Sequence, residues 1–239
     1  MSKIYEALRR HDQRPMLDED SEPLVVPTDS SFVASRQMQT LFRSVEGLLS
    51  PGGSMIMFSS AHPGEGKTTV CGGFAVTLAQ NCRKSVLILD GDRDHALTRH
   101  WGTRQDWTIP VLENQPQSIL EGGKHFGATG SVSVVPVGSL LGSTSGSSLE
   151  IGEVAALKSI LTEAFDYVLI DAPSVSEMSW APAIGAMADG VILVVQAERT
   201  RWPVALNSRR EFEGSGAKVM GVFLNRRRYY IPSRIYRRI

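Results

Sequence analysis

Residues 61–68 carry a run of residue types that suits the binding of phosphate groups. They read A-H-P-G-E-G-K-T, which matches the pattern G-x-x-x-x-G-K-[ST] except that Ala61 stands at the first glycine. Glycines let successive main-chain N–H groups point at phosphate oxygens, lysine adds positive charge, and threonine offers a hydroxyl to Mg²⁺. The alternative is a strand–helix turn without a ligand. The pattern favours a nucleotide site made of Gly64, Glu65, Gly66, Lys67, Thr68 and Thr69.

Three aspartates follow apolar runs further along the chain. Asp90 and Asp92 lie in V-L-I-L-D-G-D-R-D, and Asp171 lies in Y-V-L-I-D-A-P-S. If these runs are parallel strands, their carboxyl ends deliver all three side chains to the rim that holds the phosphate loop. Carboxylates at such a rim bind Mg²⁺, often through water, and orient or deprotonate a nucleophile. The alternative for each aspartate is a cap on the following helix.

Apolar and helical segments alternate around these residues. Short apolar runs occupy 54–60, 85–90, 131–137, 167–172, 190–197 and 218–225, and helical patterns occupy about 67–82, 150–165, 179–188 and 201–214. Several runs are apolar on both faces, which is typical of strands covered by helices on both sides. We therefore expect an α/β fold with a mostly parallel sheet flanked by helices on both faces.

The chain divides into four segments. Residues 1–34 begin with a short helical pattern and continue as a flexible acidic linker broken by prolines. Residues 35–50 have the pattern of an amphipathic helix, which ends before Pro51. Residues 51–228 hold the phosphate-binding domain, and residues 229–239 form a basic tail that contains tyrosines.

Composition narrows the classes of function. The 239 residues include 25 Lys and Arg and 25 Asp and Glu, so no global charge attracts nucleic acid. Cys71 and Cys82 form neither a metal-binding spacing nor a disulfide framework. No apolar run approaches the ~20 residues that span a bilayer. We expect a protein that is soluble or held at a membrane only from outside.

The motifs A-H-P-G-E-G-K-T-T, L-I-L-D-G-D and L-I-D-A-P-S together resemble the three nucleotide motifs of bacterial tyrosine kinases, the BY-kinases. The resemblance runs from about Ser35 to the end of the chain and implies a P-loop NTPase fold that binds ATP and Mg²⁺. It implies a catalytic set of Lys67, Asp90 and Asp92, in which Asp92 orients or deprotonates the incoming tyrosine. It also implies a metal set of Thr68, Asp90 and Asp171. The same resemblance implies a location in the cytoplasm, peripheral at the inner face of the cell membrane.

The end of the chain supports the same resemblance. Asn225 is placed like the base-reading asparagine of related ATPases, with a strand-end cap as the alternative. The tail carries three of the five tyrosines, Tyr229, Tyr230 and Tyr236, and BY-kinases usually end in tyrosines that a neighbouring subunit phosphorylates. The alternatives for this arginine-rich tail are contact with anionic lipid, docking on a partner and plain packing. Nucleic-acid binding is not favoured, because the basic patch is short.

The sequence also departs from the family pattern. The second motif reads D-G-D-R-D, and the third ends in Ser174 instead of proline. Gln37, Thr40 and Arg43 stand where the family has a charged motif that builds rings of subunits, so a homo-oligomer through this helix is in question. The leading function is a tyrosine autokinase that regulates exopolysaccharide or capsule polymerisation and export, activated by a separate membrane co-polymerase. The alternative is an ATP-dependent switch or scaffold in the same machinery.

Overall fold

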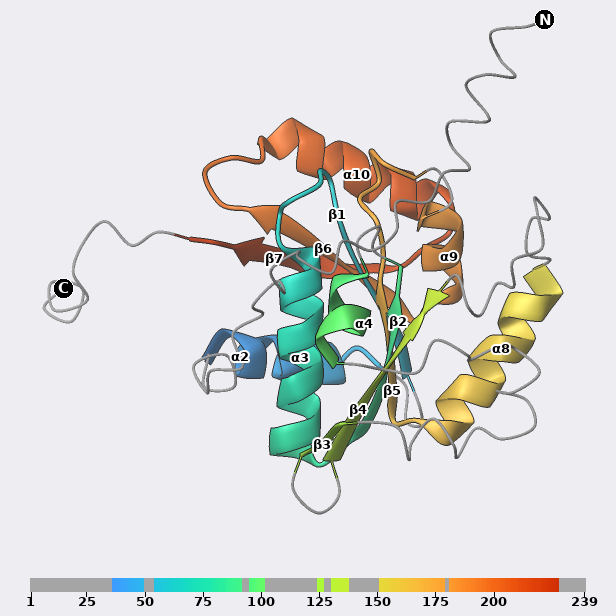
Figure 1. Cartoon of the computed structure of the whole chain (residues 1–239). Coiled ribbons are helices and arrows are strands. Elements are labelled where there is room, and N and C mark those ends of the chain that lie inside the picture. Colours follow the sequence, from blue (N-terminus) through green and yellow to red (C-terminus); the bar gives the residue numbers. More distant parts are fainter. Residues whose placement is uncertain are drawn as a thin grey trace, which may run out of the picture.

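A single twisted sheet organises the chain (Figure 1). The computed structural model describes residues 36–49, 54–91, 95–101, 124–126, 130–137, 151–178 and 181–227. Seven strands lie in the order β3-β4-β2-β5-β1-β6-β7. Their bounds are β1 Ser54–Ser60, β2 Ser85–Asp90, β3 Lys124–Phe126, β4 Gly130–Pro136, β5 Tyr167–Asp171, β6 Gly190–Gln196 and β7 Val219–Asn225.

The strand pairing confirms the predicted mostly parallel α/β sheet. Every neighbouring pair is parallel except β3 and β4, which are antiparallel at one edge. The six apolar runs of the sequence are the six parallel strands, with bounds that differ by no more than one residue at either end. The short strand β3 was not predicted, because its three residues Lys-His-Phe carry no apolar run.

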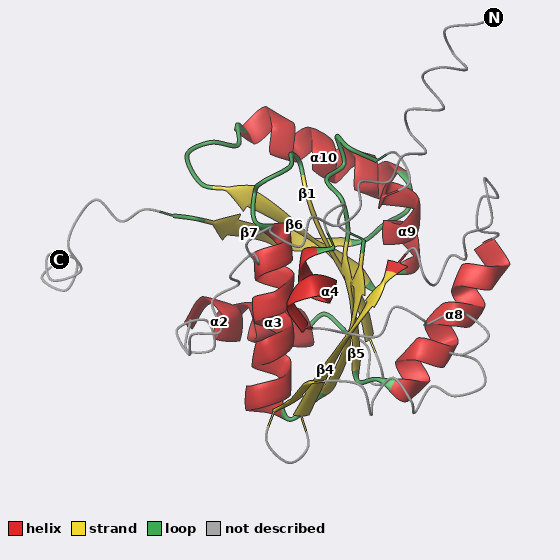
Figure 2. Cartoon of the chain, in the orientation of Figure 1, coloured by secondary structure: helices red, strands yellow, loops and turns green. Residues whose placement is uncertain are grey.

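Helices cover both faces of this sheet (Figure 2). The described helices are α2 Arg36–Glu46, α3 Lys67–Cys82, α4 Ala96–Trp101, α8 Ile151–Ala164, α9 Ala181–Met187 and α10 Trp202–Gly214. One apolar cluster joins α2, α3 and α4 to Ile56 and Phe58 of β1, and the other joins α8, α9 and α10 to Met55 and Met57. Alternate residues of β1 thus enter opposite clusters, which is why the whole run is apolar.

The amphipathic helix predicted at 35–50 corresponds to α2, which ends at Glu46 and is followed by a turn. Its buried residues Met38 and Val45 join the same apolar cluster as α3. None of the described helices is long and apolar enough to cross a membrane. The predicted helix and linker of residues 1–34 lie outside the described residues.

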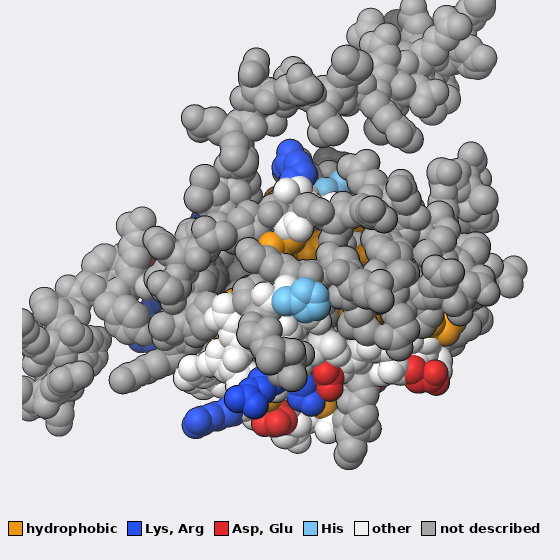
Figure 3. All heavy atoms as spheres, turned by 60° about the horizontal axis from the view of Figure 1, so that its bottom comes forward, with side chains coloured by type: hydrophobic (Ala, Val, Ile, Leu, Met, Phe, Trp, Pro, Cys, Tyr) orange, Lys and Arg blue, Asp and Glu red, His pale blue; other side chains and the backbone are white. Residues whose placement is uncertain are grey.

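The end of the molecule opposite the phosphate loop is held by a polar cluster around Asp166. Its carboxylate accepts hydrogen bonds from the Ser85 main chain at 2.8 Å and from Lys84 Nζ at 3.0 Å. Burial acts to raise the pKa of Asp166, but these hydrogen bonds outweigh it and lower that pKa, while the carboxylate raises the pKa of Lys84. Figure 3 shows basic and acidic side chains side by side on this face. The cluster joins the starts of β2 and β5.

The start of β4 lies close to the main chain of α3 at Gly130. A Cβ added to Gly130 would lie 1.9 Å from the carbonyl oxygen of Ala79, a main-chain atom that cannot move aside cheaply. We expect Gly130→Ala to lower the free energy of unfolding by about 2–3 kcal/mol, measured by chemical denaturation. Gly214→Ala is the matched control, because a Cβ there meets nothing within 4 Å. Equal stability of the two variants would contradict the prediction.

Candidate nucleotide-binding site

The phosphate loop connects the end of β1 to the start of α3, as the pattern predicts. Gly64 and Gly66 have φ angles of 78° and 91°, a left-handed conformation that glycine adopts without steric cost. The first helical hydrogen bond of α3 runs from Val70 N–H to Gly66 O at 3.0 Å. The positive end of this 16-residue helix therefore faces the loop, which is the arrangement that binds phosphate.

Lys67 is the first residue of α3 and is only 6% exposed. Thr68 beside it is half-buried and Thr69 is exposed. Burial keeps the Lys67 side chain out of bulk solvent, where its charge would be screened. A lysine that contacts phosphate is expected at this position, at the start of the helix that follows the loop.

Two buried carboxylates lie beside the loop. Asp90 ends β2, Asp171 ends β5, and the two are paired in register, each 0% exposed. Asp171 is also paired with Phe58 of β1, three residues before Ala61 of the loop. Asp90 Oδ2 accepts hydrogen bonds from Thr98 N–H at 2.8 Å and Thr98 Oγ1 at 2.7 Å. The start of α4 thus fixes the orientation of the Asp90 carboxylate.

Lys67, Asp90 and Asp171 all act electrostatically on one buried thiol, that of Cys71. Burial raises the pKa of this fully buried thiol well above its ordinary value. The carboxylates of Asp171 and Asp90 raise the pKa further, whereas the Lys67 ammonium lowers it. All three charges therefore act on one thiol, four residues after Lys67 on α3. The structure brings the predicted lysine and two of the predicted aspartates together.

These oxygen groups fit a magnesium ion. Mg²⁺ prefers carboxylate, hydroxyl, water and phosphate oxygens, and it usually keeps several waters. The Thr68 hydroxyl and the carboxylates of Asp90 and Asp171 are donors of that kind at one sheet edge. Within the described ranges no group of three or more His, Cys, Asp or Glu could hold a metal by itself.

Glu65 differs from the other loop residues in where its side chain goes. The residue is 3% exposed, and its carboxylate accepts hydrogen bonds from His62 N–H at 2.8 Å, from Gln196 N–H and from the Thr200 hydroxyl. The side chain is therefore directed at the end of β6. Its carboxylate is engaged by these three hydrogen bonds, and the predicted contact of Glu65 with nucleotide stays a prediction.

Asn225 lies against the phosphate loop. Its Nδ2 donates to Glu65 O at 2.9 Å, and its Oδ1 accepts from Arg226 N–H at 2.9 Å. A Cβ on Gly66 would lie 2.2 Å from Asn225 Nδ2, so this glycine is needed for close approach as well as for its φ. The predicted contact of Asn225 with a nucleotide base stays a prediction. Its contact with the loop was not foreseen.

Several residues of the site carry no sequence signal. Four residues at the site belong to no motif. Thr98 reaches Asp90 from the start of α4. The other three form hydrogen bonds to residues far away along the chain: Gln196, Thr200 and Arg226. Ser174, at the altered end of the third motif, donates from Oγ to Glu177 Oε2 at 2.6 Å. Asp92 and the tyrosines Tyr229, Tyr230 and Tyr236 lie outside the described residues.

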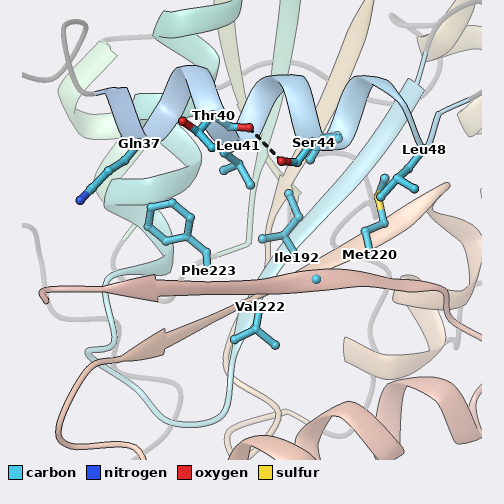
Figure 4. Close-up of a pocket in the computed structure, with 11 residues that line it drawn as sticks. Gln37, Thr40, Leu41, Ser44, Leu48, Ile192, Met220, Val222 and Phe223 are labelled. Atoms are coloured by element: carbon cyan, nitrogen blue, oxygen red, sulfur yellow. Dashed lines mark hydrogen bonds between the residues drawn. The ribbon is translucent and has the colours of Figure 1, made fainter.

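An apolar groove of about 410 Å³ lies between α2 and β7, near the C-terminal edge of the sheet. Figure 4 shows Ile192 and Phe223 on the side of β7 that faces α2, whereas Val222 lies on the other side of β7. Gln37 and Thr40 also line this groove. The two positions that lack the charges of the ring-forming motif therefore lie at this groove, and both residues are exposed.

Comparison with curated proteins finds relatives over most of the chain, although no family model matches. The tyrosine-protein kinase CpsD of Streptococcus agalactiae is 26% identical over 204 residues, which cover 83% of this chain and 87% of that protein. The tyrosine-protein kinase YwqD of Bacillus subtilis is 25% identical and covers 84% and 85%. The succinoglycan biosynthesis transport protein ExoP of Rhizobium meliloti is 25% identical over 93% of this chain but only 29% of that protein.

Solved structures share the fold. The kinase domain of Escherichia coli tyrosine kinase ETK superposes with a TM-score of 0.65 at 20% identity, over 97% of this chain and 89% of that one. The VpsO kinase domain gives 0.62 at 24% identity, over 95% and 100%. The cell division protein MinD of Aquifex aeolicus gives 0.52 at 21% identity, over 78% and 73%. The three motifs and the curated relatives named tyrosine-protein kinases together support the bacterial tyrosine kinase family for this chain.

Proposed function

We propose that this protein is an ATP-dependent tyrosine autokinase that regulates polymerisation and export of an exopolysaccharide or capsule. The observation that carries the proposal is the convergence of a buried lysine, Lys67, with two buried carboxylates, Asp90 and Asp171, at one phosphate loop. The names of CpsD and YwqD, which match along most of their length, support tyrosine kinase activity. The name of ExoP, a polysaccharide biosynthesis transport protein, supports the setting.

In the proposed reaction, the loop N–H groups and Lys67 hold the phosphates of ATP and stabilise negative charge on the γ-phosphoryl group. A bound Mg²⁺ at Thr68, Asp90 and Asp171 would neutralise further charge on the phosphates. The tyrosine oxygen forms a bond to the γ-phosphorus as the bond to the β–γ bridging oxygen breaks and ADP leaves. Asp92, or Asp90, accepts the phenolic proton. Thr98 holds the Asp90 carboxylate in place for either role.

The proposed acceptors are Tyr229, Tyr230 and Tyr236 of the tail, on the same chain or on a second copy. We propose that a membrane co-polymerase activates the reaction and holds the protein at the inner face of the cell membrane. The arginines of the tail would add attraction to anionic lipid, at about 1 kcal/mol for each basic residue near the surface. The apolar α2–β7 groove offers a surface for a homo-oligomer. Nucleic acid is not a proposed partner.

The test incubates the purified protein with Mg²⁺ and ATP labelled on the γ-phosphate, with and without the co-polymerase, and then maps the label. The proposal expects label on tail tyrosines and its disappearance when Tyr229, Tyr230 and Tyr236 are all replaced by phenylalanine. Tyr167, which is half-buried at the start of β5, is an internal control that should stay unlabelled. Absence of protein label under both conditions would overturn the kinase proposal.

A second candidate is an ATP-dependent switch or scaffold of the same machinery. The altered second motif D-G-D-R-D and the reduced ring motif on α2 favour it, because both changes affect parts that distinguish the kinases from related ATPases. The same experiment separates the two candidates. Release of ADP without label on the protein supports the switch, whereas label on the tail supports the kinase.

A further inference from the structure

The phosphate loop is held from outside by the ends of two strands that lie far along the chain. Arg226, directly after β7, donates from Nη1 to Gly64 O at 3.0 Å and to Gln196 Oε1 at 3.4 Å. Asn225 Nδ2 donates to the carbonyl of the next loop residue, Glu65, at 2.9 Å. Two consecutive loop carbonyls are thus tied to the end of β7.

The Glu65 carboxylate ties the same loop to the end of β6. It accepts from Gln196 N–H and from the Thr200 hydroxyl, and also from His62 N–H within the loop itself. The two strand ends are joined to each other by Ala197 N–H to Asn225 O at 2.9 Å. Five residues, Glu65, Gln196, Thr200, Asn225 and Arg226, therefore form a closed set of hydrogen bonds, which we name the loop clasp.

The clasp has a physical consequence for anion binding. A loop with two glycines at positive φ has many accessible conformations when it is free, and ordering it on binding costs conformational entropy. The clasp uses the outward-facing carbonyls and a buried carboxylate to fix the loop, so its N–H groups need less reorganisation when phosphate arrives. Fixing a binding loop in its bound form raises affinity mainly by removing that cost.

We propose that the loop clasp residues are positioning residues for nucleotide phosphates, and that Glu65, Asn225 and Arg226 set ATP affinity through the loop without contacting the phosphates through their side chains. This rests on the proposed nucleotide site at the loop. It assigns Glu65 and Asn225 a role that differs from direct nucleotide contact. The clasp residues act through hydrogen bonds that span about 130 to 160 positions of sequence.

The first test replaces Arg226 by glycine and by lysine. Arg226 has a φ of 55°, so glycine keeps the main-chain conformation while removing the side chain. We expect Arg226→Gly to raise the dissociation constant of Mg-ATP about tenfold, and lysine, which can donate to Gly64 O, to restore part of the affinity. Arg209→Ala is the matched control, because it removes an arginine whose partner, Glu213, lies on the exposed face of α10.

The second test uses Glu65→Gln, which keeps the size of the side chain but places an amide N–H₂ among hydrogen-bond donors. We expect an increase of about tenfold in the KM for ATP, with a much smaller change in kcat, because the bound nucleotide orders the loop. A residue that served only the stability of the fold would lower the melting temperature and leave the KM of the folded enzyme unchanged. Melting curves are therefore recorded for every variant.

The outcomes separate this proposal from the proposed function. If the wild-type protein binds Mg-ATP, the variants bind it more weakly and no tyrosine is labelled, the loop clasp proposal stands and the kinase proposal is overturned. If tyrosine is labelled and the ATP affinity of Arg226→Gly and Glu65→Gln is unchanged, the loop clasp proposal is overturned and the kinase proposal stands. Wild-type protein that binds no nucleotide overturns both.

Discussion

Replacing Lys67 with alanine is expected to reduce phosphorylation of the tail tyrosines by about 100- to 1000-fold, the usual effect of removing one preorganised charged donor from a transition state. Lys67 is buried at the head of α3, beside two glycines that bring main-chain N–H groups to the same place. The measurement is the initial rate of label transfer from ATP at saturating Mg²⁺.

Lys84→Ala is the matched control for this variant. Lys84 follows α3 at its other end, where it pairs with Asp166 on the surface, so its loss removes the same charge far from the loop. An exposed pair of this kind contributes at most about 1 kcal/mol to stability. If Lys67→Ala transferred phosphate at a rate close to that of Lys84→Ala, the assignment of the phosphate site would be wrong.

Replacing Asp90 with asparagine is expected to lower the transfer rate about 100-fold while the fold is kept. Asparagine has the same shape, and its side-chain oxygen can still accept the two hydrogen bonds from Thr98. The change therefore removes the negative charge that would bind Mg²⁺ or accept the phenolic proton, and little else. The rate is measured across Mg²⁺ concentrations, with a thermal melt of each variant.

Two further variants refine the role of Asp90. Thr98→Val removes the hydroxyl donor but keeps the Thr98 N–H, so it should lower the rate less than Asp90→Asn does. Asp166→Asn is the control for loss of a carboxylate at the other end of the sheet. A metal role predicts that high Mg²⁺ restores part of the activity of Asp90→Asn, whereas a base role predicts no restoration. Full activity of Asp90→Asn at low Mg²⁺ would exclude both roles.

The sequence predicted the sheet well because buried parallel strands are apolar on both faces. Met55, Ile56, Met57 and Phe58 each enter one of two clusters, so the pattern is visible without any structure. The loop was equally clear, because glycine adopts the left-handed φ of Gly64 and Gly66 at the least steric cost and because the lysine follows at once. Strand order then placed Asp90 and Asp171 beside the loop.

The remaining features depend on partners that a single sequence does not show. Glu65 looks like a loop residue available to a ligand, but its carboxylate is bound to Gln196 and Thr200, more than a hundred residues away. Asn225 was correctly placed at a strand end, yet its hydrogen bond to the Glu65 carbonyl depends on β7 being next to β6. Residue type shows which hydrogen bonds a side chain can form, whereas the fold determines which partner it meets.

The anchoring of Arg226 to the loop also sets an upper limit on the distance between the loop and each proposed acceptor tyrosine. The chain is fixed at Arg226, and an extended chain advances at most about 3.6 Å per residue. Tyr229 and Tyr230 are three and four positions further on, so they stay within about 11–14 Å of the rim of their own molecule. Tyr236 is ten positions on, so its upper limit is about 36 Å. Chain length from Arg226 thus separates the three proposed acceptors into a near pair and one tyrosine with a longer limit.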